Sequence, residues 1–148
     1  MLRPALSTLG VANQTDELTQ QIQAIWVATN QQRARNRLAP LKRDPKLMVA
    51  AQAYADLMSA RDQMSHTIGG LTLADKAKAV GYEFSQLSEN IALNSRLGGD
   101  FVVREQWMKS TGHRKNLLAR DSMNIGIGIA GPSKKNRYYY CQLFGTPK

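Results

Sequence analysis

The stretch Asn124-Ile125-Gly126-Ile127-Gly128-Ile129-Ala130 alternates strictly between isoleucine and a small or polar residue. Successive side chains of a β-strand point to opposite faces, so this period predicts a strand with isoleucines on one face and glycines on the other. Glycine carries no side chain to hold a neighbour away. We therefore expect another element to approach this strand closely on its glycine face.

The residues that follow predict a returning strand and, with it, a hairpin. Residues 131–136 combine glycine, proline, serine and asparagine in a turn, and residues 137–144 alternate again. One face of this second strand carries Tyr138, Tyr140, Gln142 and Phe144. Residues 87–93 are predicted to form a further short strand, which carries Glu89 and Asn90.

Upstream of the hairpin, apolar residues recur at helical spacing in two segments. The first predicted helix covers about residues 17–37 and has the apolar face Leu18, Ile22, Ile25 and Trp26. The second covers about residues 45–63 and has the apolar face Leu47, Ala50, Ala51, Tyr54, Ala55 and Met58. Asp44-Pro45 marks its start, because a carboxylate caps a helix and proline suits the first helical position. Shorter helices are predicted after a Thr72–Asp75 capping box and over about residues 101–110 and 113–118.

Helices followed by a hairpin favour an α+β fold with an antiparallel sheet. A chain of 148 residues is long enough for one domain with a real core. We expect residues 1–16 to be a poorly structured segment and residues 17–148 to be a single domain. No apolar run approaches the ~18 residues that span a bilayer. The first residues are too interrupted for the apolar region of a signal peptide, which leaves a cytosolic protein or a chain without its leader.

The chain is strongly basic, with 20 Lys and Arg against 11 Asp and Glu and a net charge of +9. Much of this charge lies within residues 33–46 and 109–120. Such a surface attracts acidic lipid headgroups, anionic cell-wall polymers or nucleic acid, and solubilising charge without a partner is the alternative. No aromatic residue interleaves with the basic ones in either segment, which disfavours a stacking platform for single-stranded nucleic acid.

Three polar residues are candidates for a functional site: His66, Glu89 and His113. They lie on three separate predicted elements, so their spacing alone does not show that they meet. Two imidazoles and a carboxylate suit zinc with an open position for water. The same residues could perform acid–base chemistry with Glu89 orienting a histidine, or form a polar pocket that only stabilises the fold.

Hydroxyl and thiol groups add few further candidates. Ser65, Ser88 and Ser110 are interpreted first as turn or capping residues, although Ser110 is also a candidate nucleophile. Cys141 is the single cysteine, which excludes an internal disulfide, and its place in an alternating strand predicts a buried structural thiol.

Several motifs together resemble the CAP superfamily of cysteine-rich secretory, antigen 5 and pathogenesis-related proteins, in its bacterial branch. Ser88-Glu89-Asn90-Ile91-Ala92 is similar to the family's G-E-N-[IL]-A motif, with serine in place of glycine. Met64-Ser65-His66-Thr67 resembles its first histidine motif, and the segment from Trp107 to Leu118 resembles its second. The predicted hairpin resembles the family's closing strands. The resemblance covers about residues 18–146, in order.

The resemblance implies an α-β-α sandwich with a central antiparallel sheet and a cleft lined by His66, Glu89 and His113. In some members such a cleft holds a divalent cation, so zinc or another divalent cation is the implied cofactor. The fourth cleft position, a glutamate in eukaryotic members, is Ser110 here. Members are generally secreted or associated with the cell envelope, which favours a chain without its leader over a cytoplasmic one.

The leading interpretation is a binding module that is not an enzyme. Its helices would offer an apolar groove to a lipid or another small amphiphile, and its basic faces would meet an anionic envelope surface. The alternative is a hydrolase, in which His113 or His66 is the base, Glu89 orients it, and Ser110 or a metal-bound water attacks. Binding of nucleic acid through charge alone is a third interpretation and the least favoured.

Overall fold

The computed structural model describes the backbone of residues 3–148 and the side chains of residues 14–148. Its first helix, α1, covers Arg3–Arg35 and therefore begins well before residue 17. The backbone of residues 3–16 is thus helical in the structure, whereas the sequence analysis expected a poorly structured segment, and residues 1–2 lie outside the described part. Pro4 stands in the first turn, where proline is compatible with a helix, and no other proline precedes Pro40. The division into a segment and a domain stays a prediction.

The other predicted helices are confirmed, with shifted bounds. Helix α2 covers Pro45–Arg61, and the Asp44 carboxylate accepts the backbone N–H of Leu47. The single turn η1, Ile68–Gly70, precedes α3, Leu73–Ala79, which opens with both hydrogen bonds of the Thr72–Asp75 capping box. A continuous helical run then contains α4 (Gly99–Phe101), the π-helical turn η2 (Val102–Gln106) and η3 (Trp107–Lys109). Helix α5 covers Thr111–Leu117.

One sheet contains all four strands of the described chain: β1 (Lys42–Arg43), β2 (Phe84–Asn94), β3 (Asn124–Ala130) and β4 (Tyr138–Pro147). Their order is β1-β3-β4-β2. The β3–β4 hairpin and the β2–β4 pair are antiparallel, as predicted, but β1 is parallel to β3. The sheet is therefore mixed rather than wholly antiparallel. A strand of two residues carries no alternating pattern from which its pairing could be predicted.

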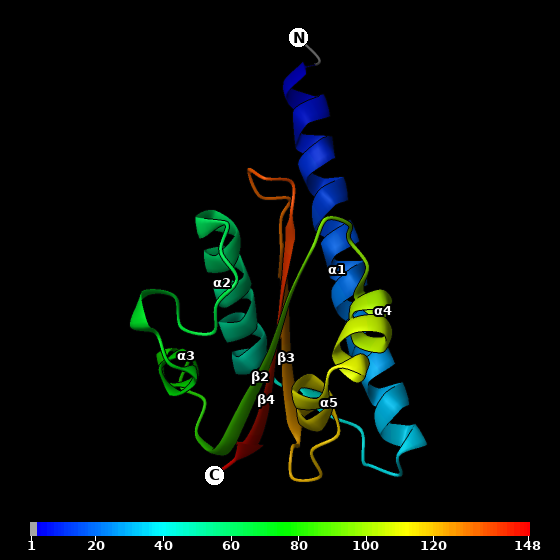
Figure 1. Cartoon of the computed structure of the whole chain (residues 1–148). Helices are drawn as coiled ribbons and strands as arrows, with labels where there is room; N and C mark the ends of the chain where they lie inside the picture. The colour runs from blue at the N-terminus through cyan, green and yellow to red at the C-terminus, as the bar shows by residue number, and fades with distance from the viewer. Residues whose placement is uncertain (1–2) are drawn as a thin grey trace.

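Helices cover both faces of the sheet, which gives three layers (Figure 1). Helices α2 and α3 pack on one face against Tyr139, Cys141 and Leu143 of β4. Helix α1, the α4–η3 run and α5 pack on the other face against the isoleucines of β3. The α+β sandwich that the sequence predicts is thus confirmed. The first turns of α1 extend beyond the other layers (Figure 1).

The glycine face of β3 is where α2 lies closest to the sheet. A Cβ atom added at Gly126 would stand 2.1 Å from the carbonyl oxygen of Leu47, and one added at Gly128 would stand 2.4 Å from the Cα of Gln52. These contacts are with helix backbone, which cannot rotate away as a side chain can. The close approach that the alternating sequence predicts is confirmed, and it fixes the position of α2.

We expect Gly126→Ala to lower the free energy of unfolding by about 3 kcal/mol, because the added methyl group would force α2 away from β3. Urea unfolding monitored by circular dichroism measures this change. Gly112→Ala is the matched control, because a Cβ at that helical glycine meets nothing within 4 Å. The control should leave stability unchanged or raise it by up to ~1 kcal/mol. Equal stability of the two variants would contradict the proposed role of Gly126.

Candidate functional site

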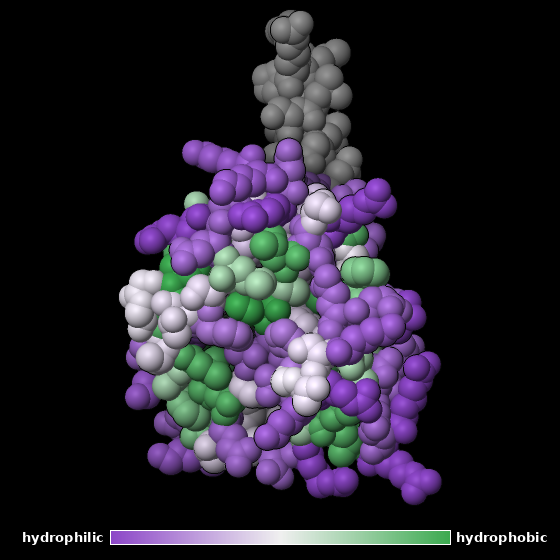
Figure 2. All heavy atoms as spheres, in the orientation of Figure 1, coloured by the Kyte–Doolittle hydropathy of each residue, from purple (hydrophilic) through white to green (hydrophobic). Residues whose placement is uncertain are grey.

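A cleft of about 250 Å³ lies beside β2, between the segment that follows α2 and the η3–α5 segment. Its lining comprises Met64, Ile91, Ala92, Leu93, Gln106, Trp107, Ser110 and His113. Strand β2 is an outer strand of the sheet, so this cleft stands where the two helical layers meet at the sheet edge. Figure 2 shows separate hydrophobic patches on one side of the molecule, in its upper middle and at the lower left and lower right, with hydrophilic side chains between them.

Glu89 and His66 meet next to this cleft, as the sequence analysis considered. Glu89 projects from β2, and its side chain is only 4% exposed. Its Oε1 lies 2.7 Å from Nδ1 of His66, whose own side chain is 57% exposed. The carboxylate therefore fixes the orientation of the His66 ring through Nδ1, and much of the rest of the ring is exposed to solvent.

Lys76 is the residue at this site that the sequence analysis missed. Its ammonium group lies 2.7 Å from Oε2 of Glu89, and its side chain is 2% exposed. The same group donates to the carbonyl oxygen of His66 at 2.8 Å. A signal was present in the sequence: Leu73, Lys76, Ala77 and Val80 follow the i, i+3, i+4, i+7 spacing of one helix face. A lysine at an apolar position of this kind calls for a buried partner.

His113 lies on α5 and pairs with Ser110 rather than with Glu89. Its Nδ1 is 2.9 Å from the Ser110 hydroxyl oxygen, and Ser110 makes no side-chain capping bond to the helix that it precedes. Burial lowers the pKa of His113 from its ordinary value of 6.5, and the nearby charge of His66 lowers it further. The imidazole is therefore mostly uncharged at neutral pH.

Buried amide side chains position the backbone of α5 against β2. The Asn90 side chain donates to the carbonyl oxygen of His113 at 3.1 Å and to Gln142 of β4 at 3.2 Å. Asn116 donates to the Asn90 side chain at 2.9 Å and to the Glu89 carbonyl oxygen at 3.2 Å. These bonds join the carboxylate strand to the histidine helix, and the sequence analysis did not assign them.

Arg33 holds the far end of α5. Its guanidinium group donates to the carbonyl oxygens of Leu117 at 3.0 Å and Ala119 at 2.9 Å. The residue is 1% exposed, so it does not belong to the basic surface in which the sequence analysis counted it. A cation at the C-terminal end of a helix also complements the partial negative charge of its free carbonyl groups.

The three predicted metal ligands do not come together as a metal-binding group in this structure. Within the described part of the chain, no three His, Cys, Asp or Glu side chains are grouped closely enough to hold a metal ion. Both oxygens of Glu89 already have partners, and Nδ1 of His113 faces Ser110. These residues do not fit a His–His–Glu zinc site as they stand, and zinc binding stays a prediction from the sequence.

The Cys141 thiol is buried and free, as predicted. Its sulfur lies 3.9 Å from Oε2 of Glu89, and burial is the largest cause that raises the pKa of this thiol. A buried, protonated thiol is a poor nucleophile, which supports its structural interpretation.

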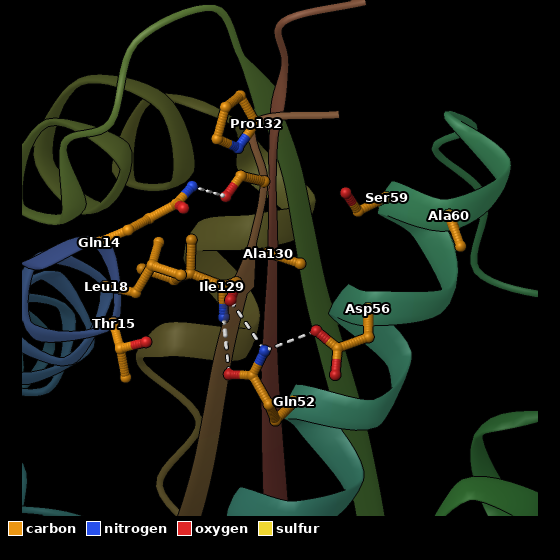
Figure 3. Close-up of a pocket in the computed structure, with 11 residues that line it drawn as sticks. Gln14, Thr15, Leu18, Gln52, Asp56, Ser59, Ala60, Ile129, Ala130 and Pro132 are labelled. Atoms are coloured by element: carbon orange, nitrogen blue, oxygen red, sulfur yellow. Dashed lines mark hydrogen bonds between the residues drawn. The ribbon is translucent and has the colours of Figure 1, made fainter. Parts of the chain in front are cut away.

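A separate hollow of about 420 Å³ lies between α1 and α2 at the end of β3 (Figure 3). None of the predicted site residues lines it. Its side wall includes Gln52, whose amide accepts the Ile129 N–H at 3.2 Å and donates to the Ile129 carbonyl oxygen at 2.8 Å. One helical turn earlier, the Met48 sulfur accepts the N–H of Ile127 at 3.3 Å. These side chains thus hydrogen-bond to backbone groups of β3 that no neighbouring strand pairs.

Residues 26–144 match CAP, the cysteine-rich secretory protein family. The chain belongs to this family, as its motifs predicted, and it has the α+β fold of the family. An uncharacterised membrane protein of Bacillus subtilis, YlbC, is 33% identical over 117 residues, which are 78% of this chain and 32% of that protein. The chain spans about a third of the length of the curated relatives it matches, 32% and 38%.

Two solved structures support the same fold. An extracellular protein with an SCP domain from Bacillus anthracis is 28% identical, with a TM-score of 0.75 over 86% of this chain and 40% of that one. An outer surface protein of Borrelia burgdorferi is 22% identical, with a TM-score of 0.79 over 87% of this chain and 94% of that one. These relatives are extracellular, surface or membrane proteins by name. In the part of the chain that the structure describes, no helix is long and apolar enough to span a bilayer.

We expect an NMR titration to place the midpoint of the His113 imidazole below its value in urea-unfolded protein. His66→Ala should move the midpoint upward, because it removes the second cause of the lowered pKa. The folded pKa lies below the unfolded one, so the unfolded state takes up the proton first as pH falls. The contribution of His113 to stability is therefore complete above about pH 6.5 and is lost as pH falls through the folded pKa. A folded midpoint equal to or above the unfolded one would contradict this placement.

Proposed function

We propose that this chain is a secreted or envelope-associated binding module that takes up a small amphiphile and meets an anionic envelope surface. The observation that carries the proposal is an apolar groove of about 330 Å³ between α2 and α3. Its lining comprises Ala50, Ala53, Tyr54, Leu57, Leu71, Lys76, Ala79 and Val80. The extracellular and surface relatives support the proposed location.

The composition of the groove suits a hydrocarbon chain. Six of its eight lining residues are aliphatic, and alanines at three of these positions leave the space that larger side chains would fill. Its volume is near the lower end of the range of about 300–1,000 Å³ for small-molecule sites. We therefore expect a single acyl chain or an amphiphile of similar size rather than a bulky lipid.

Exposed basic side chains support the anionic partner. Residues 35–46 expose Arg35, Arg37, Lys42, Arg43 and Lys46, and the α5 region exposes Lys109, Arg114, Lys115 and Arg120. Arg43 is partly fixed in place, because its guanidinium stacks 4.4 Å from the centre of the Trp26 ring. Attraction between such a surface and acidic lipids or cell-wall polymers weakens as salt screens it.

We expect dodecanoate, below its micelle concentration, to bind the wild type in isothermal titration calorimetry. Ala53→Trp should weaken this binding at least tenfold, because Ala53 is an exposed residue of the groove and the indole would fill the space. Val49→Trp is the matched control, since Val49 is 61% exposed on the same helix and does not line the groove.

Two results would contradict the groove as the binding site. One is the absence of binding to the wild type, and the other is equal binding by Ala53→Trp and the wild type. Co-sedimentation with vesicles of acidic lipid tests the charged surface separately. Retention at low salt and release at about 0.5 M salt would support it, because the screening length is then only a few ångströms.

A hydrolase is the second candidate, and the Ser110–His113 hydrogen bond of 2.9 Å favours it. An uncharged imidazole beside a hydroxyl group can accept its proton, and the apolar cleft next to both groups could hold an acyl portion of a substrate. Glu89 does not orient His113, because its carboxylate bonds His66 and Lys76. The structure therefore favours a two-residue Ser–His arrangement over the version in which Glu89 orients His113.

If the chain is a hydrolase, we expect Ser110→Ala and His113→Gln each to lower turnover of short-chain p-nitrophenyl esters about 100-fold or more. Ser85→Ala is the control, because Ser85 is an exposed serine at the start of β2 whose hydroxyl bonds only Thr146 in the described chain. Full activity in both site variants would exclude this pair as the catalytic group.

A further inference from the structure

We propose that the ammonium group of Lys76 is a built-in cation of the histidine cleft, in the place that a divalent metal ion would need beside Glu89. The wild-type cleft would then retain no zinc at Glu89 and His66, and removal of this one charge would create a zinc site there. This inference concerns the Glu89–His66 pair beside the cleft. Lys76 and Tyr54 also line the α2–α3 groove, but zinc binding does not require that the groove bind an amphiphile.

Lys76 is fully engaged within the fold. A lysine ammonium has three N–H donors. Two of its contacts are with Glu89 Oε2 at 2.7 Å and with the carbonyl oxygen of His66 at 2.8 Å. The third is with the face of the Tyr54 ring, whose centre lies 3.1 Å away. No proton of the ammonium depends on solvent, so the group is held in one position.

The charge of Glu89 is balanced within the fold. The carboxylate and the ammonium form a buried pair, with side chains 4% and 2% exposed. A divalent ion at the same oxygen would meet a fixed positive charge at close range in a poorly solvated site, where repulsion is strong. Without Lys76, the buried carboxylate would lack a compensating charge, which is a costly state that a bound cation relieves.

Two metal-binding groups already meet at Glu89. Lys76 would vacate Oε2 of its carboxylate, and Nδ1 of His66 lies 2.7 Å from Oε1. Carboxylate and imidazole are both zinc ligands, with water able to complete the coordination. His113 is not required, because its Nδ1 faces Ser110. The site opened by loss of Lys76 would therefore use two of the three predicted ligands.

Zinc titration by calorimetry tests the proposal. We expect the wild type to bind no zinc ion at this site. Any zinc that it does bind should be bound equally by His66→Ala. Lys76→Met, which keeps the unbranched stem of the side chain but lacks the ammonium group, should bind one zinc ion at least tenfold more tightly than the wild type. Glu89→Gln in the Lys76→Met background should abolish that binding. Lys78→Met is the matched control, because Lys78 is an exposed lysine of the same helix, and it should behave as the wild type does.

Three outcomes would overturn the proposal: one-to-one, His66-dependent zinc binding by the wild type, a folded Lys76→Met variant that binds no zinc, or equal binding by Lys76→Met and Lys78→Met. If Lys76→Met does not fold, the wild type still provides a test through NMR of its ¹⁵N-labelled lysine ammonium groups. The Lys76 signal should persist unchanged in the presence of stoichiometric zinc. A shift or loss of the Lys76 signal on addition of zinc would show that the metal displaces the ammonium group, which would also overturn the proposal.

Discussion

The backbone of α2 lies against β3 at a distance that only glycine permits, and the geometry of the cleft depends on this contact. Because Gly126 and Gly128 admit the helix, Tyr54 of α2 reaches the segment that carries His66. The Tyr54 hydroxyl donates to the carbonyl oxygen of Ser65 and accepts the N–H of Ile68. The His66 loop is thereby fixed on both sides of the histidine, and its ring stands over Glu89. Packing of a helix on a sheet thus sets the position of a polar side chain on a third element.

The other helical layer reaches the same edge of the sheet by a different physical route. Thr29 of α1, Gln142 of β4 and Asn90 of β2 form a chain of buried polar contacts that ends at the backbone of His113. Such groups must satisfy one another once buried, so they specify one arrangement of the layers rather than several. Packing of α2 on the sheet, through Tyr54, positions His66, and a network of buried amide side chains positions His113. Both histidines lie beside β2, but only His66 bonds the Glu89 carboxylate.

Local sequence signals predicted the elements, whereas contacts between distant residues decided the site. Asp44-Pro45, the Thr72–Asp75 box and the alternation around Gly126 each act within a few residues, so they could be read directly. The parallel pairing of β1 could not, because two residues carry no period. Glu89, the ion-pair partner of Lys76, lies 13 residues away on another element, and Arg33 reaches two carbonyl oxygens 84 and 86 residues away. Charge counting therefore placed Arg33 on the surface and passed over Lys76. Family motifs located His66, Glu89 and His113 but not which of them would pair.

At both edges of the sheet, side chains hydrogen-bond to strand backbone groups: on β2, which is an outer strand, and on the part of β3 beyond its two-residue pairing with β1. On β3, Met48 and Gln52 take groups of Ile127 and Ile129, and on β2 the Trp107 indole donates to the Ile91 carbonyl oxygen at 3.1 Å. A strand edge with free backbone groups is a template on which the strand of another molecule can assemble. These side chains interrupt that template at both edges. Copies at high concentration would therefore meet through their charged exteriors, and the sheets would resist assembly into aggregates.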